Sequence, residues 1–259
     1  MGILNVTPDS FYDGGVYNSE DKLLQQVEKM LQEGATFIDI GGCSTRPGAD
    51  EVTVEEETIR VELAVQAIQN AFPSCLISVD TFRSEVVKKA VAKGACMVND
   101  ISAGQLDDKM LNTIAALQVP YIMMHSRGNP KTMQSLTDYD QLIGDLIKFF
   151  SKQIYRASIL KINDLLIDPG FGFAKTLDQN YELLNQLELL QILEKPILCG
   201  VSRKSMIYKT LKCSAKEALN GTTALHMVAL QNGASILRVH DVKPAMECIK
   251  LYQRLNQNQ

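Results

Sequence analysis

The segment Leu76-Ile-Ser-Val-Asp80 is a short apolar run that stops at a polar or charged residue, here Asp80, and seven other segments of the chain follow the same pattern. A strand that is buried on both faces has such a continuous apolar sequence, so each run predicts a strand of a parallel sheet. The runs are Met1–Asn5, Phe37–Ile40, Leu76–Asp80, Met97–Asp100, Tyr121–His125, Leu165–Asp168, Ile197–Ser202 and Ile236–His240. Polar residues at the carboxyl ends of these strands are expected to gather on one rim of the sheet.

Helical patterns fill the intervals between the runs. In residues 19–33 the apolar side chains recur on one helical face, which predicts an amphipathic helix with Ser19 as its N-cap. A Gly-Ala pair precedes three of the runs, at Gly34, Gly94 and Gly233, and predicts a helix C-cap just before a strand.

Eight alternations of strand and helix in 259 residues predict a single (β/α)8 barrel, or TIM barrel, with residues 1–259 as one domain. The active site of this fold is built at the C-terminal ends of the strands. An open doubly wound sheet is the structural alternative, but it usually carries a G-x-G-x-x-G fingerprint, which this sequence lacks.

Composition limits the class of protein. Hydrophobic residues make up 46% of the chain and the net charge is −4 without a basic tract, so we expect a globular protein that binds neither nucleic acid nor a membrane. No basic leader precedes a signal-like segment, which favours a cytoplasmic location. The six cysteines include no C-x-x-C pair, so neither structural zinc nor a disulfide framework is expected.

The polar residues expected on the rim fall into two chemical groups. The carboxylates and amides are Asp39, Asp80, Asn99 and Asp168, and the cations and donors are Arg46, Arg203, Lys204, Arg238 and His240. A buried carboxylate needs hydrogen-bond donors, so the first group suits a flat heterocycle with several N–H groups. Arginine binds phosphate oxygens in pairs, so the second group suits a phosphate or diphosphate. Together the groups predict a ligand in which a heterocycle is joined to a phosphate ester.

Three loops after predicted strands are suited to closing over such a ligand. Residues 7–11 and 13–15 combine polar side chains and glycines with the aromatic residue Phe11, and residues 41–48 combine glycines with two hydroxyls and a cation. Either loop could act as a lid that excludes water. Residues 168–173 form a rigid turn with two aromatic side chains that could pack against a planar substrate.

These blocks, in this order, resemble the dihydropteroate synthases, a family of pterin-binding barrel enzymes. The resemblance runs almost end to end and rests on Met1–Phe11, Asp39–Gly48, Ser78–Thr81, Asn99–Asp100, Asp168–Phe173, Ser202–Lys204 and Arg238–His240. Cys43 departs from the family pattern, since many relatives have a larger polar residue there. The resemblance implies a transferase of folate biosynthesis that joins (7,8-dihydropterin-6-yl)methyl diphosphate to p-aminobenzoate and releases pyrophosphate. It also implies a target of sulfonamides.

The resemblance further implies the roles of individual residues. The pterin would be bound by Asp80, Asn99, Met123, Asp168, Lys204 and Arg238, the diphosphate by Asn5, Arg46, Arg238 and His240, and p-aminobenzoate by Phe11, Thr45, Pro47, Phe173 and Ser202. The residues with catalytic roles would be Asn5, Arg46, Lys204, Arg238 and His240. Asn5 would also contact Mg²⁺, which commonly bridges a few protein oxygens to substrate phosphates. The diphosphate would leave first, and the arylamine would then attack the pterin-methyl cation without a protein nucleophile.

Several other residues receive a structural interpretation. Glu55–Glu57 are expected on a solvated helix face, His226 is expected to be packed and hydrogen-bonded, and Arg203 is left without a role. The helix predicted from Ala218 to Leu230 is apolar around much of its circumference. Together with the family resemblance, this favours a homodimer.

Three alternative functions remain open on the sequence. A methyl-transferring relative that serves a corrinoid protein would need the pterin-binding group but not the cations around a diphosphate. A barrel aldolase would use Lys204 as a Schiff base, which requires a desolvated lysine with a lowered pKa. A non-catalytic pterin-binding protein would not need the two lid motifs.

Overall fold

Eight parallel strands form one sheet that curls into a barrel. The computed structural model describes residues 1–6, 16–43, 52–129 and 132–256. The strands are β1 (Gly2–Asn5), β2 (Phe37–Gly41), β3 (Leu76–Asp80), β4 (Met97–Asp100), β5 (Tyr121–Met124), β6 (Leu165–Asp168), β7 (Ile197–Cys199) and β8 (Ala234–Leu237). Each strand pairs with the next one along the chain, in the order β1 to β8. The predicted α/β barrel is confirmed.

Backbone hydrogen bonds between the two ends of the sheet close the barrel. The amide of Ile3 donates to the carbonyl of Val239, and the amide of Val239 donates to the carbonyl of Met1, both at 2.9 Å. Gly2 and Val239 form an isolated parallel bridge. The last strand therefore lies beside the first, although they are separated by almost the whole sequence.

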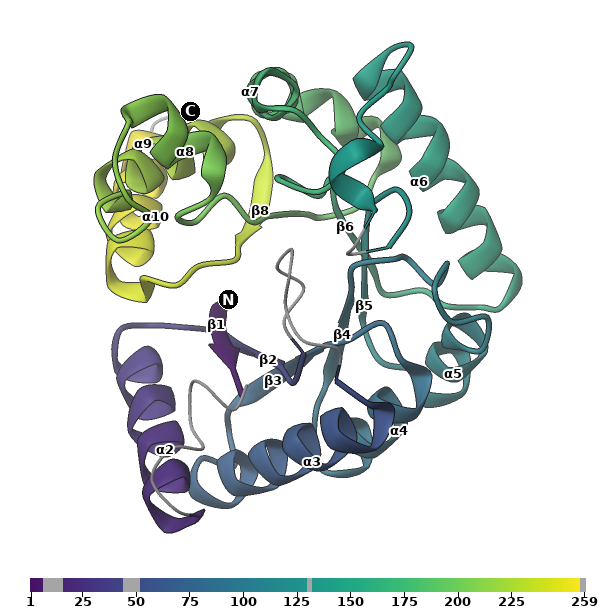
Figure 1. Ribbon diagram of the computed structural model, residues 1–259, viewed down its shortest axis with the longest axis vertical. Coiled ribbons are helices and arrows are strands. Elements are labelled where there is room, and N and C mark those ends of the chain that lie inside the picture. The colour runs from purple at the N-terminus through teal and green to yellow at the C-terminus, as the bar shows by residue number, and fades with distance from the viewer. Residues whose placement is uncertain (7–15, 44–51, 130–131, 257–259) are drawn as a thin grey trace.

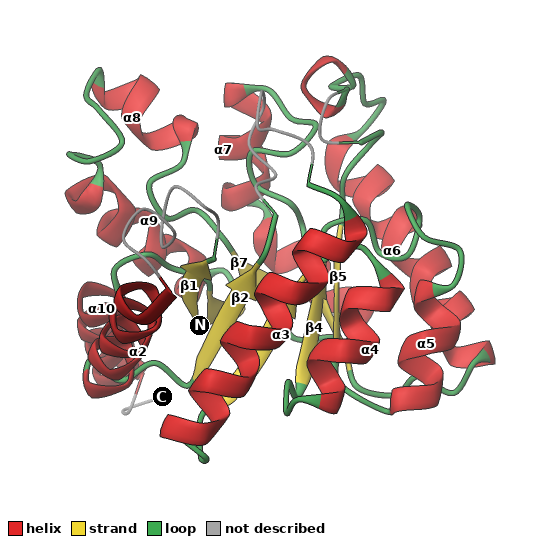
Figure 2. Cartoon of the chain, turned by 60° about the horizontal axis from the view of Figure 1, so that its bottom comes forward, coloured by secondary structure: helices red, strands yellow, loops and turns green. Residues whose placement is uncertain are grey.

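Helices surround the strands, as Figure 1 shows in a view into the ring. The α-helices are α2 (Val16–Gln32), α3 (Val54–Ala71), α4 (Ser84–Ala92), α5 (Met110–Leu117), α6 (Leu142–Ile159), α7 (Leu177–Asn185), α8 (Ser205–Leu211), α9 (Leu219–Gln231) and α10 (Val242–Asn256). Two 3-10 helices, η1 (Met133–Ser135) and η2 (Leu187–Leu193), lie in the connections. Helices α3, α4 and α5 lie side by side over the outer face of the sheet (Figure 2).

The apolar side chains form two separate layers. A large outer cluster packs the strands against the helices. A small inner cluster fills the barrel with Met97, Ile122, Leu166 and Leu198, flanked by Met1, Phe37 and Ile236. Side chains two residues apart on a strand face the same side, so the residues that follow this inner cluster by two positions also face the interior. These include Asp39, Asn99, Asp168 and Arg238, and the apolar layer thus supports a polar one at the carboxyl end of the barrel.

The predicted helix ends are confirmed at the glycines and wrong at the first N-cap. Gly34, Gly94 and Gly233 have φ values of +100°, +112° and +92°, the left-handed conformation that glycine adopts without steric cost. Helix α2 begins at Val16, so Ser19 lies within the helix and cannot be its N-cap. None of the helices in the described ranges is long and apolar enough to cross a membrane.

His226 is packed inside the protein but lacks the expected hydrogen bonds. Its side chain on α9 is only 2% exposed, and neither ring nitrogen has a hydrogen-bond partner among the described residues. Burial lowers the pKa of His226 to about 4, and the carboxylate of Asp241 acts in the opposite direction. The neutral imidazole is therefore the folded form.

Replacing His226 should change how stability depends on pH. Because the pKa is about 4 in the folded state against 6.5 in the unfolded state, the unfolded state binds the proton first, and stability is lost as the pH falls below 6.5. A His226→Leu variant lacks this loss, so relative to wild type it should gain about 2 kcal/mol in the free energy of unfolding between pH 7.5 and pH 5. Urea unfolding of both proteins at pH 7.5 and pH 5 measures this gain. If the free energies of unfolding of variant and wild type differed by the same amount at the two pH values, the lowered pKa of His226 would be contradicted.

Candidate active site

Polar side chains from β3, β4 and β6 converge at the carboxyl end of the barrel. Asp80 on β3 is in register with Asn99 on β4, and Met124 on β5 is in register with Asp168 on β6. Residues in register on neighbouring parallel strands face the same side. Asn99 and Asp168 are 4% and 5% exposed, so their polar groups are nearly removed from bulk water.

Arg238, one residue beyond β8, links the carboxylates of two other strands. Its Nε donates to Oδ2 of Asp39 at 2.6 Å, and one of its terminal nitrogens donates to Oδ2 of Asp80 at 2.6 Å. The amide of Asn99 donates to the same Asp39 oxygen at 3.0 Å. Four strand ends are therefore joined by one hydrogen-bonded network, which we call the Arg238 network.

The electrostatics of the Arg238 network depend on burial. Burial opposes the charge of Arg238, yet Asp39 and Asp80 together hold its pKa above the ordinary value for a guanidinium. Burial raises the pKa of Asp80, while Arg238 acts in the opposite direction. Oδ1 of Asp39 and Oδ1 of Asn99 are buried without a hydrogen-bond partner among the described residues. Each of these two oxygens therefore keeps an unused capacity to accept a hydrogen bond.

Asp168 and Lys204 lie at the same rim and influence each other electrostatically. Burial raises the pKa of Asp168, against the effect of the nearby ammonium of Lys204. Burial lowers the pKa of Lys204 to about 8, and Asp168 opposes this change. Nζ of Lys204 donates to the carbonyl oxygen of Phe171 and lies 4.9 Å from the ring centre of Phe173. This lysine is therefore held by the turn that follows β6.

Ser202 and His240 meet where the chain leaves β7 and β8. The hydroxyl oxygen of Ser202 lies 3.1 Å from Nδ1 of His240 and accepts from the His240 amide at 3.2 Å. The neighbouring Arg203, left without a role by the sequence, forms two hydrogen bonds with Asp241 at 2.7 and 3.0 Å. Arg203 thus has a structural role in joining these two loops.

Asn5 offers an oxygen that suits a hard cation. Asn5 is in register with Gly41, which is in turn in register with Asp80. A Cβ atom at Gly41 would lie 3.4 Å from Oδ1 of Asn5 and 3.7 Å from Oδ2 of Asp80, so both oxygens lie close to this glycine. In the described part of the chain, no group of three or more His, Cys, Asp or Glu residues could hold a metal ion. The residues present therefore suit an Mg²⁺ ion that takes most of its ligands from waters and substrate phosphates and few from the protein.

One predicted pterin-site residue faces the wrong side of the sheet. Ile122, its neighbour, belongs to the inner cluster, whereas Met123 belongs to the outer one and is fully buried against the helices. The assignment of Met123 is therefore wrong, and Met124, which is in register with Asp168, is the methionine on the inner side. The error arose because alternation alone does not say which of two adjacent methionines faces inward.

Four predicted residues cannot be compared with the structure. Phe11, Thr45, Arg46 and Pro47 lie outside the described residues. The other predicted polar residues lie on the strand ends and loops described above. A cavity of about 550 Å³ lies between the loops after β4 and β5, and none of the predicted site residues lines it.

Glu57 is buried, contrary to the expectation of a solvated helix face. It is 1% exposed, accepts from the hydroxyl of Thr81 at 2.6 Å and forms an ion pair with Arg83 at 2.7 Å. The sequence did contain a signal, because Glu57 precedes Val61 by four residues and so lies on the buried face of α3. Arg83 also donates to the carbonyl of Val52 at 2.8 Å. The Glu57–Arg83 ion pair and this hydrogen bond therefore connect the segment just before α3 to the segment just after β3.

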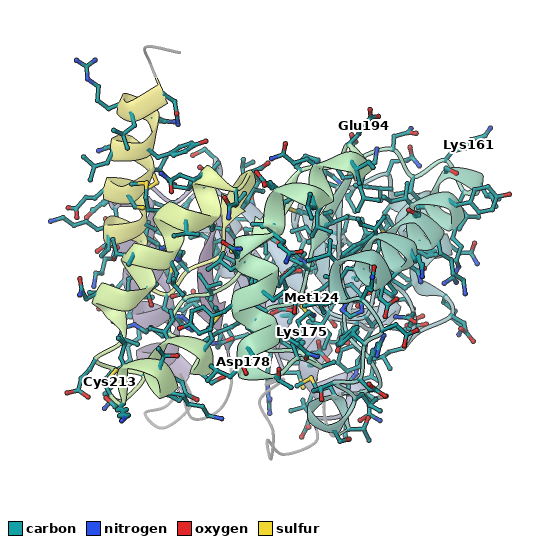
Figure 3. All side chains as sticks on the ribbon, turned by 90° about the horizontal axis from the view of Figure 1, so that it is seen from above. Met124, Lys161, Lys175, Asp178, Glu194 and Cys213 are labelled. Carbon is teal, nitrogen blue, oxygen red and sulfur yellow. The ribbon has the colours of Figure 1, made fainter. Side chains whose placement is uncertain are left out.

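The sequence analysis missed a buried lysine close to the rim. Nζ of Lys175 lies 3.2 Å from Nδ1 of His125, the residue that follows β5. In the view of Figure 3, Lys175 and Met124, the last residue of β5, both lie within the body of the protein, whereas Lys161, Glu194 and Cys213 lie near its edges. A lysine after a glycine-rich turn has no sequence pattern that distinguishes it from a solvated one.

Comparison with known proteins gives one consistent result. The profile of the family described as pterin binding enzyme matches residues 1–240. A dihydropteroate synthase from Synechocystis is 46% identical over 258 residues, which cover 98% of this chain and 89% of that protein. The Yersinia pestis dihydropteroate synthase, solved with a sulfonamide drug, has a TM-score of 0.92 and 42% identity, covering 100% of this chain and 94% of that one. The Xanthomonas albilineans enzyme, solved with 4-aminobenzoic acid, has a TM-score of 0.91 and 39% identity, covering 99% of this chain and 92% of that one.

These similarities separate the functions that the sequence left open. The matched relatives are synthases, and none of the three compared is a corrinoid-dependent methyltransferase, an aldolase or a non-catalytic binding protein. The chain therefore belongs to the pterin-binding enzyme family of the dihydropteroate synthases, which are transferases of folate biosynthesis.

Proposed function

We propose that this protein transfers the (7,8-dihydropterin-6-yl)methyl group from its diphosphate to p-aminobenzoate, producing 7,8-dihydropteroate and pyrophosphate. The observation that carries this proposal is that the Arg238 network lies at the same end of the barrel as Asp168 and Lys204, and that both cations act on the pKa of Asp168. Such a site offers buried acceptors for a heterocycle and buried cations for an anion.

Recognition of the pterin follows from the buried carboxylates. Asp168 would accept from the 2-amino group and the neighbouring ring N–H, and Lys204 would donate to the carbonyl side of the ring. Asp80 and Asn99 would accept or donate hydrogen bonds at the other edge of the pterin ring. Burial alone raises the pKa of Asp168, so N–H donors from the ligand would favour its ionised form. Arg238, with its planar guanidinium, would cover the ring face.

Departure of the diphosphate depends on stabilising negative charge. Arg238, His240, Asn5 and Arg46 would surround the diphosphate, with Arg238 held in place by Asp39 and Asp80. The bond between the methylene carbon and the bridging oxygen breaks, and its electron pair leaves with the diphosphate. The carbon that remains is a cation stabilised by the electron-rich ring.

Magnesium would be held by Asn5 together with waters and the diphosphate. When bound, Mg²⁺ supplies positive charge that neutralises the departing oxygens. The protein contributes the side-chain carbonyl oxygen of Asn5, which lies close to Gly41, and the cations named above.

The arylamine completes the reaction. Its nitrogen forms a bond to the methylene carbon and loses a proton, which gives dihydropteroate. Phe173, Ser202 and Lys204 would border the p-aminobenzoate, joined by Phe11, Thr45 and Pro47. The position of the Lys204 ammonium 4.9 Å from the Phe173 ring centre supports a shared role of these two residues.

A homodimer and a cytoplasmic location also remain predictions. Part of the apolar circumference of α9 is already covered within the chain, because Leu225, Met227 and Val228 pack against the core. The apolar character of this helix is therefore weaker support for a second subunit than the sequence suggested.

The reaction itself is the first test. Purified protein with Mg²⁺, dihydropterin diphosphate and p-aminobenzoate should release pyrophosphate and form dihydropteroate in equal amounts, measured by a coupled pyrophosphate assay and mass spectrometry. Removal of the metal with EDTA should reduce the rate at least tenfold, and added Mg²⁺ should restore it. Absence of the product with all three components present would refute the proposed function.

Asp168→Asn should weaken pterin binding. The amide keeps the shape but loses the charge and one acceptor for the paired N–H donors. A loss of about 2 to 3 kcal/mol for hydrogen bonds to a charged group corresponds to an increase of roughly 30- to 150-fold in the KM for the pterin diphosphate. Asp164→Asn is the matched control, because Asp164 precedes the same strand at the other end of the barrel and is exposed. Equal effects of the two substitutions would remove Asp168 from the site.

Sulfonamides should compete with p-aminobenzoate. They present an arylamine beside an electron-rich polar group, and the Yersinia pestis relative was solved with such a drug. Increasing sulfonamide should raise the apparent KM for p-aminobenzoate and leave the rate at saturating p-aminobenzoate unchanged. Inhibition that p-aminobenzoate cannot reverse would contradict a shared pocket.

A further inference from the structure

Lys175 is a buried lysine whose three hydrogen-bond partners are all fixed by the fold. It is 4% exposed. Its Nζ donates to the carbonyl oxygens of Gly170 at 3.1 Å and Phe173 at 3.2 Å, and it lies 3.2 Å from Nδ1 of His125. An ammonium has three N–H donors and here it meets three acceptors, provided that the neutral His125 carries its proton on Nε2.

The pair can keep these contacts in either protonation state. A neutral amine has two N–H groups for the two carbonyls, and its lone pair can accept from Nδ1–H of the other His125 tautomer. His125 is held on its other sides, since its ring packs against Phe149 with a centroid distance of 4.8 Å in an edge-on arrangement. Its position therefore does not depend on Lys175 alone.

The two carbonyls that Lys175 binds belong to the turn that follows Asp168. The amide of Gly170 donates to Oδ1 of Asp168 at 2.8 Å, and the amide of His125 donates to the Asp168 carbonyl at 2.9 Å. Gly170 has a φ of +74°, and a Cβ atom there would lie 2.0 Å from the carbonyl oxygen of His125. The turn is thus pressed against the end of β5, and Lys175 ties its two ends together.

We propose that Lys175, supported by His125, is a positioning residue that fixes the Gly170–Phe173 turn so that Asp168 and Phe173 are ready to receive the two substrates. The inference rests on the proposed function, because it takes Asp168 and Phe173 as substrate contacts. It assigns Lys175 no contact with either substrate.

A lysine is a costly choice for a purely structural position. Burial lowers the pKa of Lys175 to about 7, with Asp168 opposing and Lys204 and Arg127 adding to the decrease. An apolar side chain of the same length would avoid this desolvation, but the Phe173 carbonyl would lose its donor and the Gly170 carbonyl would keep only the amide of Phe173. The contacts to the turn explain why a polar group is kept here.

Lys175→Met is the main test, because methionine keeps the length and removes every donor. For the folded variant we expect the Kd for dihydropterin diphosphate and the KM for p-aminobenzoate each to rise about tenfold, with kcat changed less than threefold. Lys152→Met on α6 is the matched control, since Lys152 is exposed and should leave all three values within twofold of wild type. A lower thermal stability with unchanged Kd and KM would reduce Lys175 to a structural residue and overturn the proposal.

His125 supplies a second test that does not depend on how well the first variant folds. Asparagine can keep an acceptor near the position of Nδ1, whereas leucine cannot, so His125→Asn should stay within threefold of wild type and His125→Leu should follow Lys175→Met. If the two residues act as one unit, the double variant Lys175→Met with His125→Leu should be no more than about twofold worse than the single Lys175 variant. Independent, multiplying effects would contradict a shared role.

The pH dependence separates positioning from a simple effect of charge. Asp168, Lys204, Arg127 and His125 are the titratable or charged groups that face Lys175. Because the contacts persist in both protonation states, the ratio of variant to wild-type KM should stay constant between pH 6 and pH 8. A ratio that falls towards one above pH 7 would mean that the charge of Lys175 acts on Asp168 directly and would overturn the positioning role. An inactive wild type would instead reject the proposed function, so the two failures are distinguishable.

Discussion

The ion pairs between Arg238 and the carboxylates of Asp39 and Asp80 are the interaction on which the site depends. One guanidinium from the end of β8 joins the ends of β2 and β3, and Asn99 adds β4 through the same Asp39 oxygen. Removing one member of a buried ion pair costs about 3 to 5 kcal/mol, because the remaining charge loses its partner inside the protein. The barrel mouth can therefore hold several buried charges only as a complete set.

The inner apolar layer makes this arrangement possible. Met97, Ile122, Leu166 and Leu198 fill the barrel below the polar residues. Water is thereby excluded from one side of the charged groups, and their side chains are fixed by strands rather than by loops. Electrostatic contacts are stronger in such a setting than in water, which suits a reaction that separates a diphosphate from a carbon cation. The alternation of side chains between the two faces of each strand thus produces both the apolar layer and the polar layer above it.

Much of the fold and part of the site could be predicted from the sequence. The apolar runs ending on Asp80, Asp168 and their counterparts identified the strands, because a strand buried on both faces has an unmistakable composition. Orientation was harder, as Met123 shows, because the register with neighbouring strands decides which of two adjacent residues faces the interior. The prediction for Glu57 was wrong for a related reason. A charged residue is usually exposed, but Glu57 lies on the buried face of α3. Lys175 could not be found at all, because its partners come from two different strand ends.

The closure of the barrel by residues 1–3 and Val239 has a consequence for biosynthesis of the protein. During translation Asp39 and Asp80 leave the ribosome long before Arg238 does. Until the final strand emerges, a nascent chain carries two acidic groups with no guanidinium to neutralise them, and the ring of strands stays open. The charged mouth of the barrel can therefore assemble only after Arg238 has left the ribosome.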